Sequence, residues 1–304
     1  MESFSRFKWT STSQSYGVRN LHDIGDHPLP KGLPASPRPG FQLSRSNTDV
    51  RLHTHREDNL TIRNPDDIAE HLCVLAHDLY AVIRPQECLT WLKARTGADV
   101  ANLHRFLDVH DHIAAWVQKS IVTYDNPGRR ADTLDFWICV AEKCRSLRNF
   151  DSFGAIMTGL SNVVLSLRST WARCSRKQSF DVLAKTYDSS NGFGKLIAIM
   201  GTANEPCVPF IRAYLTNITE AEKECPDDIS PCSVRKTAVG LLIKRRMIDD
   251  TLSAMMRFQF PSYTFRVLSS TRKFVDEQLR GAGSTTSTWI EARSRELAEL
   301  DFGA

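Results

Sequence analysis

Eight cysteines are the residues of this 304-residue chain that could supply a nucleophile or bind a soft metal ion. No two of them form a CxxC pair, the spacing typical of a structural zinc site. A catalytic cysteine needs a basic microenvironment that lowers its pKa, whereas several of these lie in apolar or helical stretches. We expect reduced, partly buried thiols in a reducing compartment. The eight are Cys73, Cys88, Cys139, Cys144, Cys174, Cys207, Cys225 and Cys232.

Histidines form the second group with chemical potential. His104, His110 and His112 lie close together, but no carboxylate stands at ligand spacing from them. A metal site and partly exposed helix histidines are both open, and we expect the latter. His53 and His55 likewise fit a solvated segment better than a metal site. The chain has no Walker loop, GxGxxG, GxSxG or HExxH motif, so we expect neither cofactor nor metal.

Composition narrows the class of protein. Hydrophobic residues make up 41% of the chain and charged residues 24%, enough for a large core. A net charge of +4 is too weak for a typical nucleic-acid-binding face. No apolar run approaches the ~20 residues that span a bilayer, and the N-terminus lacks a signal-peptide layout. We expect an intracellular, cytoplasmic protein; recruitment to a membrane surface by a partner stays open.

The elements that would position a site begin near residue 64. Residues 1–63 are rich in Ser, Pro, Gly, Arg and His, without an apolar period, which predicts a disordered polar tail. Asn64 then suits a helix N-cap, and Pro65 suits the first helical position. Apolar residues repeat at helical spacing as far as Ile83, before Arg84-Pro85 ends the element.

Further amphipathic segments predict an irregular multi-helix all-α domain over residues 64–304. No alternating strand pattern of useful length and no fixed-period repeat is present. We expect the apolar run of 130–147 to continue into 153–167. The other expected helical segments are 100–122, 179–187, 239–259, 269–279 and 288–300.

The stretch PCVPFIRAYLTNITEAEKEC, residues 206–225, predicts the start of a helical hairpin over about 207–260. Its two prolines restrict the backbone before the helix. Phe210, Tyr214 and Ile218 recur every four residues, so one helix face can pack down. The polar run after Thr219 predicts a charged tip, and LIKRRMIDDTLSAMMRFQ predicts the returning helix.

Three stretches stand in order along the chain. They are DDIAEHLCVLAHDLYAVIRPQECL, RNFDSFGAIMTGLSN…LRSTW, and PCVPFIRAYLTNIT with LLIKRRMIDDTLSAMMRFQFPSYTF. Together they resemble the opening helix, the central motif and the hairpin of the catalytic domain of Ras-type guanine-nucleotide exchange factors (RasGEF). The likeness covers about residues 64–301. The accessory helical domain that usually precedes this module is not expected within some sixty polar residues.

The resemblance implies a function without covalent chemistry. In this family the hairpin projects from a helical core and opens the nucleotide site of a Ras-family small GTPase, so that GDP leaves. A second, apolar surface grips the GTPase through one of its aromatic side chains. The implied partner is therefore a Ras-family small GTPase. A module of the same fold that binds a GTPase without efficient exchange is the alternative.

The resemblance also assigns site residues. Phe210, Leu107 and Phe193 match apolar positions of the gripping surface, although ordinary core packing stays open for all three. Thr216 matches a threonine near the start of the hairpin. Thr219 matches the position that approaches the magnesium site of the GTPase.

Departures from the family pattern fall at interface positions. The tip is usually acidic, and an ungapped alignment puts Lys223 there, whereas a one-residue slip restores Glu222 or Glu224. The remaining departures are Arg212 for a glycine, Gly154 for a bulky apolar residue, Ser161 for an asparagine that Asn162 adjoins, and Asp111 for an asparagine.

A nucleic-acid-binding helical protein is a third reading. It rests only on a basic cluster that the RasGEF family shares in part, and basic helix faces are usually solvated. We therefore expect no nucleic-acid partner. The cluster consists of Arg235, Lys236, Lys244, Arg245 and Arg246.

Overall fold

The computed structural model describes residues 60–93, 97–189, 192–224 and 234–302, without the side chains of residues 165, 221–224, 234–239 and 302. The expected polar tail lies almost wholly outside these residues and stays a prediction. The prediction is wrong for the last part of the tail. Leu60–Ile62 forms a short 3-10 helix, η1, and the Leu60 side chain is buried in the core.

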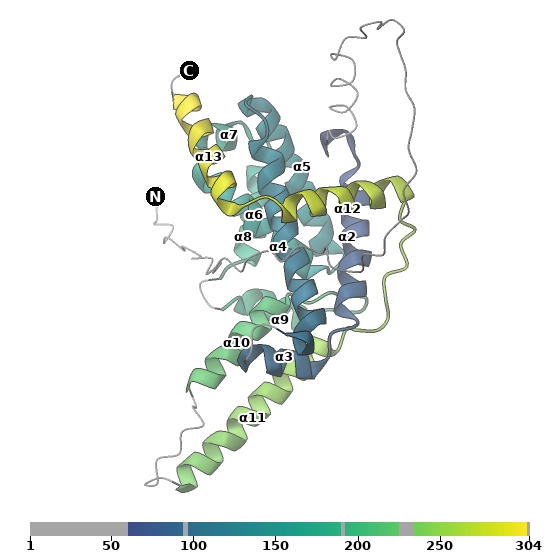
Figure 1. Ribbon diagram of the computed structural model, residues 1–304, viewed down its shortest axis with the longest axis vertical. Helices are drawn as coiled ribbons and strands as arrows, with labels where there is room; N and C mark the ends of the chain where they lie inside the picture. The colour runs from purple at the N-terminus through teal and green to yellow at the C-terminus, as the bar shows by residue number, and fades with distance from the viewer. Residues whose placement is uncertain (1–59, 94–96, 190–191, 225–233, 303–304) are drawn as a thin grey trace, which may run out of the picture. The chain divides into compact units, whose positions relative to one another are not determined.

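The described residues form helices without a β-strand, which confirms the all-α prediction (Figure 1). A second 3-10 helix, η2 (Ala98–Val100), precedes the longest core helix. In chain order the α-helices are α2 (Pro65–Tyr80), α3 (Pro85–Lys93), α4 (Ala101–Val122), α5 (Pro127–Ser146), α6 (Phe150–Ser166), α7 (Arg168–Arg173), α8 (Lys177–Thr186), α9 (Gly194–Gly201), α10 (Ile211–Glu224), α11 (Val234–Met256), α12 (Ser269–Gly283) and α13 (Ser287–Phe302).

Helix α2 begins as the sequence predicts. The Asn64 side chain accepts a hydrogen bond from the backbone N–H of Asp66, and Pro65 is the first helical residue. The helix ends at Tyr80, a few residues before the expected stop. Arg84-Pro85 marks the start of α3 instead, because proline suits the first turn of a helix.

Helices α4 and α6 form the centre of the core, and α2, α5, α12 and α13 pack around them. Gly159 permits the close approach of α6 to α4. A Cβ at that position would lie 2.8 Å from the backbone oxygen of Ala114 and 2.7 Å from Val117 Cβ. On the α5 side of α4, Trp116 and Trp137 make an edge-to-face contact with ring centroids 4.7 Å apart. Both indoles are buried.

The apolar run of 130–147 does not continue into 153–167, which corrects the expectation of one element. Arg148 adopts a left-handed backbone conformation with φ 63°, which ends the helical path after α5. Asn149 then caps α6 by accepting a hydrogen bond from the N–H of Ser152 at 3.1 Å. The break turns the chain so that α6 packs beside α5.

Helix α3 supplies a cap for α4 from outside that helix. Glu87 is buried, and its carboxylate accepts hydrogen bonds from Leu103 N at 2.9 Å and from Asn102 Nδ2 at 2.8 Å. A third hydrogen bond comes from Arg84 Nε at 3.0 Å. Burial raises the pKa of Glu87, but these hydrogen bonds outweigh it and hold the pKa below its usual range.

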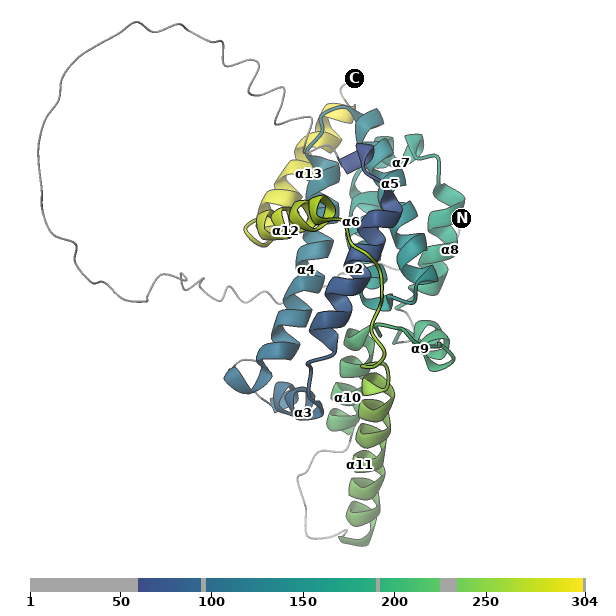
Figure 2. The same cartoon turned by 90° about the vertical axis from the view of Figure 1, so that its right-hand side faces the viewer.

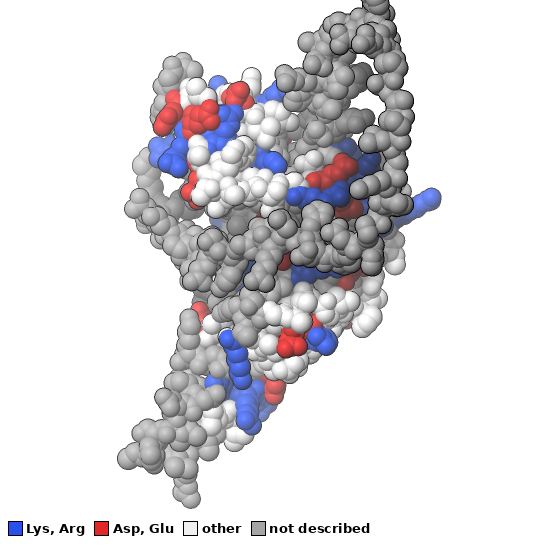
Figure 3. Space-filling view, in the orientation of Figure 1, with Lys and Arg blue, Asp and Glu red and all other residues white. Residues whose placement is uncertain are grey.

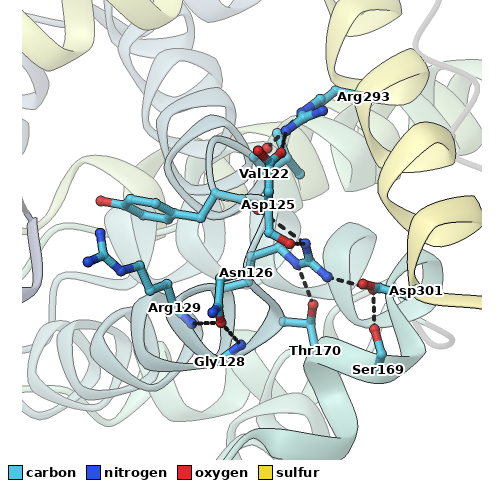
Figure 4. Close-up of polar contacts among 11 residues, drawn as sticks. Val122, Asp125, Asn126, Gly128, Arg129, Ser169, Thr170, Arg293 and Asp301 are labelled. Atoms are coloured by element: carbon cyan, nitrogen blue, oxygen red, sulfur yellow. Dashed lines mark hydrogen bonds and ion pairs between the residues drawn. The ribbon is translucent and has the colours of Figure 1, made fainter. Parts of the chain in front are cut away.

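Helix α13 is fixed to the core by charged side chains (Figure 4). Arg130 is fully buried at the start of α5, and its Nη2 donates to Asp301 of α13 at 2.5 Å. The Asp301 carboxylate also accepts from the Ser169 hydroxyl. Arg293 binds the backbone oxygen of Val122 and the Asp125 carboxylate. Figure 3 shows basic and acidic side chains interspersed over α12 and α13.

Helices α10 and α11 lie side by side and extend away from the other helices in both views (Figures 1 and 2). Tyr80 holds the C-terminal end of α11: its hydroxyl donates to the backbone oxygen of Met255 at 2.6 Å and accepts from Phe258 N at 3.2 Å. Arg257 donates to three backbone oxygens at the end of α9, those of residues 200, 201 and 203. These contacts fix the base of the predicted hairpin; its loop, 225–233, lies outside the described residues.

Candidate functional site

The proline-bracketed segment that leads into α10 is paired with the junction of α5 and α6. Val208 N donates to the backbone oxygen of Arg148 at 3.0 Å, and Phe150 N donates to the backbone oxygen of Val208 at 2.9 Å. Val208 is fully buried. This short pairing therefore fixes the backbone just before Phe210 and the start of α10.

Phe210 lies at the centre of an aromatic cluster. Its ring centroid is 5.0 Å from that of Phe193, 5.7 Å from that of Tyr187 and 5.7 Å from that of His110. Burial raises the pKa of Tyr187 to about 12, and its hydroxyl lies 2.9 Å from Thr158 Oγ1. These rings come from α4 and from the segments that precede α9 and α10, so the cluster joins elements far apart in the sequence.

Two of the three expected gripping residues, Phe210 and Phe193, meet in this cluster, and Leu107 lies about one turn before His110 on α4. All three expose little surface. Phe210 is 1%, Phe193 5% and Leu107 7% exposed. Phe193 has φ 60°, a left-handed conformation that is strained for a bulky residue, and it stands at the N-cap of α9. Core packing is thus part of the role of all three, and their contact with a partner stays a prediction.

Gly154 makes room for the Phe210 ring. A Cβ at Gly154 would lie 2.8 Å from Phe210 Cε2 and 3.4 Å from Tyr187 Cε2, too close for the first pair. The sequence places a glycine where the RasGEF pattern has a larger apolar residue, and the Phe210 ring occupies that space here. Ser161, two turns further along α6, is half-buried.

A stripe of polar side chains runs along α10 beside its buried face. Thr216 and Thr219 are half-buried, and their hydroxyls donate to the backbone oxygens of residues 212 and 215 at 2.9 Å and 2.7 Å. Arg212 begins the stripe at helical spacing. The opposite face carries Tyr214 and Ile218, both buried as the sequence predicts.

The backbone of α10 continues to its charged end. The helix runs to Glu224, so Glu222 and Lys223 belong to it, although their side chains lie outside the described residues. Lys223 is seven residues, about two turns, beyond Thr216 and therefore shares its side of the helix. Glu222 falls to one side of that line. The helical register thus favours Lys223 on the stripe, whereas its function stays a prediction.

Two polar contacts border the cluster. His110 Nδ1 lies 3.2 Å from Asp151 Oδ1, and both side chains are buried between α4 and α6. Arg212 Nη2 lies 2.7 Å from Asp111 Oδ1 and 3.1 Å from the backbone oxygen of Leu107. Sequence reasoning named Arg212 and Asp111 only as separate departures and missed their contact, because neither spacing nor composition pairs residues a hundred positions apart.

The described cysteines are free thiols, and Cys207 lies in the segment just before Phe210. Burial raises the pKa of Cys73, Cys88, Cys174 and Cys207 to about 12, which keeps them protonated and weakly nucleophilic. Cys144 is shifted in the same direction by the same cause. Cys225 and Cys232 fall outside the described residues.

The sequence profile of the RasGEF domain matches residues 67–246, more than half of the chain and the part that contains the aromatic cluster, α10 and the first half of α11. The chain belongs to the RasGEF domain family. The resemblance to this family is therefore confirmed, and the assignment of individual site residues stays a prediction.

Individual relatives share this domain at low identity. Ras guanine nucleotide exchange factor Y of Dictyostelium discoideum is 26% identical over 71% of this chain and 14% of its own length. Ras guanine nucleotide exchange factor E of the same organism is 30% identical over 55% of this chain and 17% of its own. Ras-specific guanine nucleotide-releasing factor 1 of Rattus norvegicus is 28% identical over 65% and 16%. The chain thus spans less than a fifth of the length of these relatives.

Proposed function

We propose that this RasGEF domain promotes release of GDP from a Ras-family small GTPase. The observation that carries the proposal is the pair α10 and α11. It extends from the core directly after Phe210 of the aromatic cluster, and α10 carries a buried face and, along another side, a half-buried threonine stripe. Among the described helices none is long and apolar enough to cross a bilayer. Peripheral recruitment to a membrane through the GTPase belongs to this proposal.

Exchange of this kind is a binding equilibrium. A small GTPase holds its nucleotide through phosphate contacts to backbone amides, a lysine and a magnesium ion. A domain that binds the nucleotide-free GTPase more tightly must, by linkage, weaken nucleotide binding by the same factor. GTP and GDP then rebind according to their concentrations. The RasGEF domain itself needs no nucleophile, which agrees with thiols whose pKa is raised by burial.

In this proposal, one surface acts on the nucleotide site of the GTPase and a second surface binds the GTPase. The threonine stripe of α10 would meet the nucleotide site of the GTPase, with Thr216 and Thr219 near the magnesium ion. The rim of the aromatic cluster would hold the GTPase, with Phe210, Phe193 and Leu107 forming its rigid floor. Their low exposure implies support of the surface, with contact limited to ring and methyl edges.

The test is release of fluorescent GDP from purified Ras, Rap, Ral and Rho-type GTPases with excess unlabelled GTP. We expect accelerated release from at least one Ras-family member and a slower effect from Thr219→Ala. Thr251→Ala is the matched control, because Thr251 on α11 also donates to the carbonyl four residues earlier at 2.7 Å and is half-buried. Binding without accelerated release from any GTPase would contradict the exchange function and favour the binding module.

The charge at the end of α10 provides a second prediction. If Lys223 faces the nucleotide site, Lys223→Glu should raise the release rate, because a carboxylate repels phosphate and competes for magnesium. If an acid already stands there, the double change Glu222→Ala with Glu224→Ala should slow release and Lys223→Glu should matter little. Each 1.4 kcal/mol in the barrier changes the rate about tenfold, so stopped-flow release separates these cases.

A further inference from the structure

Arg212 links the first turn of α10 to α4 through one nitrogen atom. Its Nη2 donates to the backbone oxygen of Leu107 at 3.1 Å and to Asp111 Oδ1 at 2.7 Å. Leu107 and Asp111 are four residues apart, so both acceptors lie on one turn of α4. The start of α10 is therefore bound to the turn of α4 that also carries His110 of the aromatic cluster.

The Arg212 side of this contact is more enclosed than in an ordinary surface ion pair. The Arg212 side chain is 25% exposed, whereas that of Asp111 is 65% exposed. The Arg212 Nε atom is buried as well and has no hydrogen-bond partner among the described residues. Moving α10 away from α4 would leave a mostly buried guanidinium without its counter-charge, which is unfavourable. The pair thus resists a pivot of α10 about its first turn.

The position of Arg212 on α10 connects the pair to the proposed site. Arg212, Thr216 and Thr219 follow one another at intervals of four and three residues, so they share one side of the helix. A change in the angle of the first turn would move both threonines together. Helix α10 otherwise packs mainly along α11, which extends from the core beside it (Figures 1 and 2).

We propose that Arg212 and Asp111 are positioning residues that fix the angle of α10, and with it the threonine stripe, against the turn of α4 that carries Leu107. This inference rests on the proposed exchange function. Neither residue has to touch the nucleotide. Their effect is to hold the stripe in one orientation before a GTPase arrives.

The first arm of the test uses the protein without a GTPase. Hydrogen exchange measured by mass spectrometry should show the amides of residues 211–220 exchanging about fivefold faster in Arg212→Ala and in Asp111→Ala. The double variant should lose no more protection than Arg212→Ala alone, because that change already removes the hydrogen bonds to both Asp111 and Leu107. Arg176→Ala and Glu142→Ala are the controls: that pair joins α8 to α5 at 2.5 Å, away from α10, and should leave these amides unchanged.

The second arm measures exchange and binding separately. With a responsive GTPase at saturation, Arg212→Ala should slow GDP release about fivefold, while affinity for the nucleotide-free GTPase stays within about twofold. Arg212→Lys, which keeps the charge, should regain most of the rate. A purely structural loss would instead lower the melting temperature and the fraction of active protein, without this split.

The possible outcomes separately test the support of α10 by the pair, its positioning role and the proposed exchange function. Unchanged protection of α10 in both single variants overturns the pairing as a support of the helix. Lost protection with an unchanged release rate overturns the positioning role. A wild-type chain that binds GTPases but accelerates release from none overturns the proposed function instead, and hydrogen exchange then still decides whether the pair fixes α10.

Discussion

Phe210 packs in the core and also matches a position that the family resemblance assigns to GTPase binding. Its ring touches those of Phe193, Tyr187 and His110, so it is a structural centre as well as a matched position of the gripping surface. Truncating a fully buried phenylalanine costs roughly 3–5 kcal/mol. Loss of GTPase binding after such a change would therefore report unfolding as well as contact. A more selective probe of this site changes the fit of the ring without removing it.

Gly154→Ala is that probe. The added Cβ would lie 2.8 Å from Phe210 Cε2, and neighbouring rings limit the retreat of Phe210. Overpacking costs ~1–3 kcal/mol and alanine regains up to ~1 kcal/mol of helix propensity, so we expect a loss of about 1–2 kcal/mol in urea unfolding. Gly240→Ala on α11 is the control, because nothing lies within 4 Å of a Cβ there; it should be neutral or stabilising. Equal effects of the two changes would contradict the packing argument.

At this scale the sequence predicted types and spacing better than contacts. The buried face of Tyr214 and Ile218 followed from a spacing of four, and the structure confirms it. The contact between Arg212 and Asp111 could not follow, since it depends on how α10 crosses α4. Both had been noted as departures from a family pattern, and the structure shows that the two departures are each other's partners.

Helix boundaries depend on caps that come from elsewhere in the fold. The long helices carry enough apolar repeats to be predicted, whereas α3, α7 and α9 have 9, 6 and 8 residues and too few turns to show a period. The break between α5 and α6 depends on a left-handed Arg148, which local propensity does not favour. Glu87 is the clearest case, because its carboxylate caps a helix that begins fourteen residues later.

Glu87→Gln tests this cap. The amide loses the charge and one acceptor oxygen, so we expect about 1.5–3 kcal/mol lower stability at neutral pH. The folded pKa of Glu87 is lowered, so its contribution is complete above the ordinary glutamate pKa and is lost as the pH falls through the folded value. Denaturant unfolding from neutral to acidic pH should therefore show the difference from wild type shrinking. Glu299→Gln, at an exposed position of α13, should show little difference at any pH.

At the scale of the whole molecule, the core contains histidines whose pKa is lowered by burial, His71 and His77. His71 is buried between α2 and α12, and neither ring nitrogen has a hydrogen-bond partner among the described residues. Burial lowers the pKa of His71, and the nearby charges of Asp276, Arg272 and Asp78 act on it in mixed directions. Protonation of His71 is therefore less favourable in the folded state than in the unfolded chain. Stability should fall as the pH drops through the ordinary histidine pKa.

His71→Leu should flatten this pH dependence. The change removes the titrating group without breaking a hydrogen bond, so the variant should lose less stability than wild type between pH 7.5 and about 5. Urea unfolding at several pH values measures it. His77→Leu is the contrast, because His77 Nε2 lies 3.3 Å from the backbone oxygen of Phe258 and its loss should also lower stability at neutral pH. Parallel pH curves for wild type and His71→Leu would contradict the assignment.

The 23-residue α11 is clamped near one end by Tyr80 and Arg257. At 1.5 Å per residue it is a lever arm of roughly 34 Å, and a tilt of about 5° at the clamp displaces the far end by about 3 Å. That displacement is about equal to the donor–acceptor distance of a hydrogen bond. Under the proposed function, the accuracy with which the far end of α11 meets a GTPase therefore depends in part on the Tyr80 phenol and the Arg257 guanidinium at the other end of the helix.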